Sequence, residues 1–105
     1  MEQFIDLGLS EDMLATLEHK GFTAPTPVQQ AIIPFLLTDE RDVVARSATG
    51  TGKTAAFGIP IIERLDTSDR RVKALVLTPT RELALQVAHE LNSLKRKRRL
   101  STLAV

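Results

Sequence analysis

Eight consecutive residues have the composition of a phosphate-binding loop: Ser47-Ala48-Thr49-Gly50-Thr51-Gly52-Lys53-Thr54. Small residues let successive backbone N–H groups point at one anion, and the N-terminus of a following helix adds partial positive charge. Lys53 would place its ammonium on the β- and γ-phosphates, and the Thr54 hydroxyl would bind Mg²⁺. Ser47 stands where a strict Walker A motif has glycine. We predict that all eight residues bind a nucleoside triphosphate and that Lys53 and Thr54 are catalytic; the alternative is a Gly/Thr loop that only caps a helix.

A second candidate site lies upstream, in Gly21-Phe22-Thr23-Ala24-Pro25-Thr26-Pro27-Val28-Gln29. The side-chain amide of Gln29 can donate and accept at once, which matches the N6 donor and N7 acceptor of adenine. The ring of Phe22 offers a surface on which a base could stack. Both residues also have a structural interpretation, because Thr26 and Gln29 have the spacing of a capping box and Phe22 suits a core. Neither interpretation is excluded by the residues alone.

A third candidate site is Pro79-Thr80-Arg81, followed by Glu82-Leu83-Ala84. A helix that begins at Thr80 would present free N–H groups and the Arg81 guanidinium, which together suit a phosphodiester backbone. The alternative is a capped helix in which Arg81 pairs with Glu82.

The three segments lie between alternating helix and strand patterns. We expect one helix from Ser10 to about Lys20 and a second that begins at Thr26-Pro27 and kinks at Pro34. A third helix is expected from Lys53 to about Leu65, despite Gly58 and Pro60. A fourth begins at Thr80 and has an apolar face formed by Leu83, Val87, Leu91 and Leu94. Short apolar runs predict strands at 43–45, 74–77 and 102–105. This alternation predicts an α/β fold with a parallel sheet and flanking helices, in which both phosphate-binding segments follow the carboxyl ends of strands.

Length, composition and charge narrow the class of protein. A chain of 105 residues with 43% hydrophobic and 26% charged residues is one ordinary globular unit, and the lack of cysteine fits a reducing compartment. The acidic start and short apolar runs predict no signal peptide and no membrane span, so we expect a cytoplasmic protein. Residues 1–52 carry a net charge of −5 and residues 53–105 one of +6, which favours a polyanionic partner. The basic run 95–99 is either a solvated helix end or a nucleic-acid contact.

Together the three motifs resemble those of the DEAD-box family of ATP-dependent RNA helicases. The segment from Gly21 to Gln29, with the lone aromatic Phe4 upstream, looks like the family's Q motif. The segment 48–54 looks like motif I and 79–84 like motif Ia. The likeness extends from Phe4 to Val105, with small departures at Ala24 and Ser47.

The resemblance implies a role for each motif. Gln29 and Phe22 would engage the adenine of ATP, Lys53 and Thr54 the triphosphate and Mg²⁺, and Pro79, Thr80 and Arg81 the backbone of RNA. The fold would be a P-loop NTPase of RecA-like type, truncated, with residues 1–30 as the Q-motif region and 42–105 as an incomplete P-loop core. ATP hydrolysis would drive unwinding of RNA duplexes by a monomeric parent protein whose second RecA-like domain lies in the same chain.

The chain carries no Asp-Glu-Ala-Asp box. We therefore expect the 105 residues alone to bind nucleotide at best and to be catalytically inactive. Two alternatives remain at this point: a stand-alone nucleotide-binding fragment, and a small-molecule kinase with the same phosphate loop. The kinase gives no reason for the segments around Gln29 and Arg81.

Overall fold

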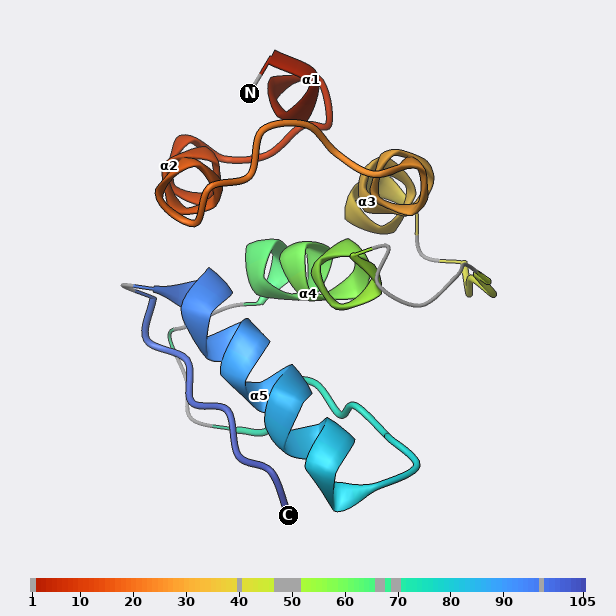
Figure 1. The fold of residues 1–105 in the computed structure, drawn as a ribbon, viewed down its shortest axis with the longest axis vertical. Coiled ribbons are helices and arrows are strands. Elements are labelled where there is room, and N and C mark those ends of the chain that lie inside the picture. Colours follow the sequence, from red (N-terminus) through yellow and green to blue (C-terminus); the bar gives the residue numbers. More distant parts are fainter. Residues whose placement is uncertain (1, 40, 47–51, 66–67, 69–70, 97) are drawn as a thin grey trace.

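The structure is a computed structural model that describes residues 2–39, 41–46, 52–65, 68, 71–96 and 98–105. Within these residues the regular elements are helices (Figure 1): α1 (Glu2–Ile5), α2 (Glu11–His19), α3 (Pro27–Thr38), α4 (Lys53–Arg64) and α5 (Arg81–Lys95). No helix among them combines the length and the apolar composition needed to cross a bilayer.

The predicted helix starts are confirmed by their caps. The Ser10 hydroxyl accepts a hydrogen bond from the Met13 N–H at the start of α2, and the hydroxyl of Thr80 does the same for Leu83 at the start of α5. Each bond supplies a partner to an N–H group that the first helical turn leaves free. The four-residue helix α1 was not expected from the sequence.

Helix α4 passes without interruption through Gly58 and Pro60, and α3 passes through Pro34 to Thr38. A Cβ atom on Gly58 would lie 2.8 Å from Leu91 Cδ2 and 3.3 Å from Leu94 Cδ1. The glycine therefore lets α4 and α5 pack closely, and this contact offsets its poor helix propensity.

The core forms where α4 lies between α3 and α5, with α1 and α2 covering one end (Figure 1). Three members of the predicted apolar face of α5 are buried, whereas Leu83, near the start of the helix, is 38% exposed. The buried hydrophobic cluster comprises Phe4, Leu7, Met13, Leu17, Ile33, Ala55, Ile59, Ile62, Val87, Leu91 and Leu94. Every helix contributes at least one residue to it, so the described elements share one core.

The predicted parallel sheet is not formed among the described residues. The segments 43–45, 74–77 and 102–105 form no strands, and apolar side chains along them are exposed, including Val44 (94%) and Leu77 (85%). Apolar content favours burial but does not provide a strand with a hydrogen-bonding neighbour. Without such a neighbour in the described part of the chain, these segments have no regular secondary structure.

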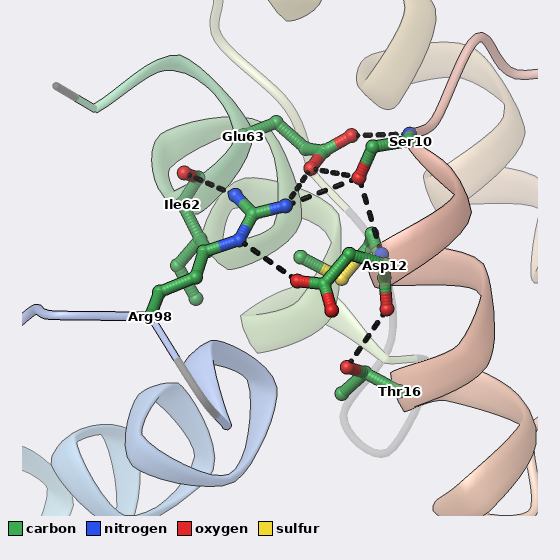
Figure 2. A network of polar contacts seen from close by, with 7 residues as sticks. Ser10, Asp12, Thr16, Ile62, Glu63 and Arg98 are labelled. Atoms are coloured by element: carbon green, nitrogen blue, oxygen red, sulfur yellow. Dashed lines mark hydrogen bonds and ion pairs between the residues drawn. The ribbon is translucent and has the colours of Figure 1, made fainter. Parts of the chain in front are cut away.

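A network of polar contacts joins the start of α2, the last turn of α4 and the segment after α5 (Figure 2). The Arg98 guanidinium forms ion pairs with Glu63 and with Asp12, at 3.3 Å for the latter, and donates to the Ile62 carbonyl oxygen at 2.7 Å. The Glu63 carboxylate also accepts hydrogen bonds from the backbone N–H and the hydroxyl of Ser10, at 2.7 and 2.8 Å. The sequence analysis considered the basic run 95–99 as a solvated helix end or as a nucleic-acid contact. Neither applies to Arg98, because its side chain faces inward and binds other parts of the fold.

Candidate functional site

The described part of the phosphate loop is its junction with α4. Gly52 is the N-cap of α4 with φ +80° and makes no side-chain cap, and the first helical bond there runs from the Ala56 N–H to the Gly52 carbonyl oxygen. The N–H groups of the first helical turn therefore have no acceptor within the helix. Lys53 is exposed and Thr54 is half-buried directly after this cap. The predicted contacts of Ser47–Thr51 lie outside the described residues.

Gln29 connects the upstream motif to this junction. The side-chain Oε1 of Gln29 accepts a hydrogen bond from the Thr26 backbone N–H at 3.0 Å, and the backbone N–H of Gln29 donates to the Thr26 hydroxyl at 3.4 Å. These two bonds form the capping box considered from the sequence. The Nε2 of Gln29 donates to the carbonyl oxygen of Gly52 at 3.3 Å. The capping role is confirmed, and the bond to Gly52 places the amide of Gln29 beside the start of the phosphate-loop helix.

The packing around Gly52 leaves no room for a side chain. A Cβ atom at this position would lie 2.3 Å from Gln29 Nε2 and 3.5 Å from Thr26 Cγ2. The left-handed φ of Gly52 disfavours other residues independently of that contact. Both the close approach and the backbone conformation therefore require glycine here.

Each polar atom of the Gln29 amide has capacity left after these bonds. Gln29 is 2% exposed, and one Nε2 proton and one Oε1 lone pair are not used by Thr26 and Gly52. Those are the donor and the acceptor that an adenine edge requires. Reading of adenine by Gln29 stays a prediction that is compatible with this geometry.

Phe22 is placed by the end of α2. Gly21, with φ +87°, donates to the Glu18 carbonyl oxygen, and the Phe22 N–H donates to that of Leu17 at 2.9 Å. This pair of bonds is a Schellman motif, which confirms that Gly21 terminates the helix, directly after its C-cap Lys20. The Phe22 ring is half-buried against Phe4, with centroids 6.0 Å apart and planes tilted by 59°. The ring can therefore serve both as part of the core and as a surface for a base, since one part of it contacts the core and another part stays accessible.

Lys20 is a neighbour of Phe22 that sequence reasoning missed. Its Nζ lies 6.0 Å from the Phe22 ring centroid, 3.5 Å from Glu90 Oε1 and within hydrogen-bonding distance of the Ser93 hydroxyl. The signal in the sequence is weak, because a lysine at a helix C-terminus is common and its partners on α5 lie about 70 residues later.

The start of α5 carries the third predicted site. Pro79, Thr80 and Arg81 are all exposed, and the Thr80 hydroxyl is used as the cap described above. No ion pair joins Arg81 to Glu82 in the part of the chain that the structure describes. The guanidinium therefore faces solvent next to the free N–H groups of a helix start, as a phosphate contact requires.

The residues at the start of α4 fit a nucleoside triphosphate. The N–H groups in the first turn of α4 have no side-chain cap, and the exposed Lys53 stands at the same helix start, so donors and a cation are available for phosphates. For Mg²⁺ the described residues offer the Thr54 hydroxyl, and they include no group of three or more His, Cys, Asp or Glu side chains placed to hold a metal. A single protein ligand is compatible with Mg²⁺, which usually keeps several waters and substrate phosphate oxygens.

Comparison with known proteins decides the family. Residues 26–105 match the family model described as DEAD/DEAH box helicase. The chain belongs to this family. It is 45% identical over 105 residues to the DEAD-box ATP-dependent RNA helicase CshA of Geobacillus kaustophilus, a match that covers 100% of this chain and 22% of that protein. Membership in the helicase family leaves the small-molecule kinase without support.

Solved structures of DEAD-box proteins agree with the described fold. A DEAD box protein from Methanococcus jannaschii matches with a TM-score of 0.88 and 47% identity, over 93% of this chain and 27% of that one. Dbp5 of S. cerevisiae, bound to RNA and ADP BeF3, matches with a TM-score of 0.88 and 32% identity, over 94% and 26%. The chain thus spans about a quarter of the length of the DEAD-box proteins it matches.

Proposed function

We propose that the protein containing this chain is an ATP-dependent RNA helicase, in which these residues bind the nucleotide and part of the RNA backbone. One observation carries the proposal: the hydrogen bond from Gln29 to Gly52 brings the upstream motif to the start of the phosphate-loop helix. In a chain of the DEAD/DEAH box helicase family, this bond places the residue proposed to contact the base next to the residues proposed to contact the phosphates.

Each nucleotide contact uses a different part of this site. Lys53, exposed at the first position of α4, contacts the β- and γ-phosphates, and Thr54 ligates Mg²⁺ through its hydroxyl. Gln29 and Phe22 contact the adenine. The remaining phosphate contacts come from backbone N–H groups of Ser47–Thr51, in keeping with their small side chains.

RNA is bound at the start of α5 through Pro79, Thr80 and Arg81. The free N–H groups of the helix start and the exposed Arg81 side chain contact phosphates, so this binding does not depend on the base sequence. Support comes from the RNA-bound state in which Dbp5, a structural neighbour, was solved.

The RecA-like parallel sheet belongs to the same proposal. Residues 43–45 and 74–77 would be strands of the complete domain, with residues 1–30 as the Q-motif region and 42–105 as part of the P-loop core. The apolar side chains exposed along both segments, Val44, Leu75 and Leu77 among them, support this assignment because a sheet would bury them. Cytoplasmic location and a monomeric state are parts of the proposal that rest on the sequence and the family resemblance.

ATP hydrolysis by the full-length protein tests this function. We expect hydrolysis to be stimulated by RNA, to accompany unwinding of a short duplex, and to be lost in Lys53→Ala. Arg41→Ala serves as the control, because Arg41 is an exposed cation whose partner is Asp39. Hydrolysis stimulated by small-molecule acceptors instead of RNA would contradict the proposal. Residues 1–105 alone are expected to show no RNA-stimulated hydrolysis.

A further inference from the structure

Lys20 occupies an unusual position at the end of α2, between the predicted base-binding loop and α5. It is the C-cap of α2 and is followed directly by Gly21 and Phe22. Its side chain is 19% exposed, which is low for a lysine on the outside of a helix. The aliphatic stem is therefore covered, and the position of the ammonium is restricted.

Two residues of α5 anchor this ammonium. It donates to the Ser93 hydroxyl and lies 3.5 Å from the carboxylate of Glu90, whose side chain is 32% exposed. The Ser93 hydroxyl in turn donates to the Glu90 backbone carbonyl oxygen at 2.7 Å, which fixes the orientation of its lone pairs. Glu90 and Ser93 are three residues apart and so share one face of α5. Lys20 thus has a fixed partner set that belongs to another helix.

The same ammonium lies 6.0 Å from the centroid of the Phe22 ring, at the outer limit of a cation–π contact. Phe4, which is fully buried, contacts the ring as well, with centroids 6.0 Å apart. The ring of Phe22 is therefore confined by a core aromatic and by a cation that is itself held by α5. Confinement before binding reduces the entropy lost when a ligand stacks on the ring.

We propose that Lys20 is a positioning residue that holds Phe22 in place for the base of the bound nucleotide, with Glu90 and Ser93 as its anchor. The inference rests on the proposed function, because Phe22 contacts a base only if this site binds a nucleotide. Lys20 acts through Phe22 on the base side alone. Its removal should leave the phosphate contacts at Gly52 and Lys53 intact.

The test compares two ligands in the full-length protein: ATP, and inorganic tripolyphosphate, which has no base. We expect Lys20→Met to weaken ATP binding by about three- to tenfold, the cost of ordering one otherwise mobile side chain on binding. Tripolyphosphate affinity should stay within about twofold, and Lys20→Arg should restore ATP affinity because it keeps the charge. Calorimetry without RNA measures both affinities, and Lys95→Met controls for removing a lysine from a helix C-terminus.

A double-mutant cycle tests the anchor. If Glu90 acts by holding Lys20, Glu90→Gln should weaken ATP binding in the parent protein and have no further effect in Lys20→Met. The inference is overturned if Lys20→Met leaves ATP affinity unchanged, if it weakens ATP and tripolyphosphate equally, or if Lys20→Arg does not restore binding. Failure of the proposed function has a different signature, namely that the unmodified protein neither binds ATP nor hydrolyses it with RNA.

Discussion

The side-chain Nε2 of Gln29 donates a hydrogen bond to the carbonyl oxygen of Gly52 across 3.3 Å, linking residues 23 positions apart. The same Gln29 side chain closes the capping box of α3, while Gly52 is the N-cap of α4. The amide of Gln29 therefore links the start of α3 to the start of α4. The first carries the predicted contact with the base and the second the predicted contacts with the phosphates. A change at either residue should affect both helix packing and nucleotide binding.

Gly52→Ala is expected to lower both stability and ATP affinity. The left-handed backbone costs a residue with a Cβ roughly 1–2 kcal/mol. The added methyl group, 2.3 Å from Gln29 Nε2, costs about 1–3 kcal/mol more through displacement of that side chain. Thermal unfolding and ATP titration of the full-length protein measure the two effects.

Gly8→Ala is the matched control for this substitution. Gly8 has φ +88° but nothing within 4 Å of its Cβ position, so alanine there carries the backbone cost alone. We expect it to lower stability less than Gly52→Ala and to leave ATP affinity unchanged. Equal effects of the two substitutions on ATP binding would show that the contact with Gln29 does not matter.

Arg98→Met is expected to destabilise the protein by about 2–4 kcal/mol. It would leave the Glu63 carboxylate, which is 8% exposed, without its cationic partner and would remove the link between α2, α4 and the end of α5 (Figure 2). Chemical denaturation measures the change. The neighbouring Arg99 is exposed, so Arg99→Met should change stability by no more than about 0.5 kcal/mol. Similar losses for both substitutions would mean that the network does not contribute to stability.

Arg81→Met is expected to weaken RNA binding by about three- to tenfold at low salt, to the same degree for different base sequences. Loss of one phosphate contact should also reduce the slope of log K against log salt by about 0.7 for single-stranded RNA. Binding titrations at several salt concentrations measure both quantities. Stability should not change, because Arg81 is exposed and contributes no buried contact. A sequence-dependent loss would contradict a backbone contact.

Leu77→Lys tests the proposed sheet. Leu77 is 85% exposed among the described residues. If a sheet in the complete protein buries this side chain, a lysine at this position should lower the stability by about 2 kcal/mol or more. Leu85, 50% exposed on α5, is the control, and Leu85→Lys should stay within about 0.5 kcal/mol. Thermal unfolding of the full-length protein distinguishes the two. No loss at Leu77 would count against a strand at 74–77.

Local sequence signals were sufficient for the helix starts. Ser10, Thr26 and Thr80 were expected as N-caps, and each hydroxyl accepts the bond that the cap requires. A cap involves residues within one turn of each other, so the sequence contains all the information it needs. The termination of α2 by Gly21 follows for the same reason.

The predicted strands had no such local support. A strand is stable only beside another strand, and the apolar residues at 74–77 do not indicate which segment would pair with them. The contacts of Lys20 with Glu90 and of Arg98 with Glu63 were missed for a related reason. Each joins residues far apart in the chain whose types, taken singly, are typical of a solvated surface.

By itself, the sequence determined the motifs, their order, the family they resemble and the helices that carry them, because these depend on residue types at short spacing. The tertiary structure decided that Gln29 contacts Gly52 and that Phe22 contacts both Phe4 and Lys20. It also decided that the Arg98 guanidinium binds Glu63 instead of facing solvent. Those relationships depend on how the helices α1 to α5 pack around shared apolar residues, and packing over such distances is a property of the whole fold.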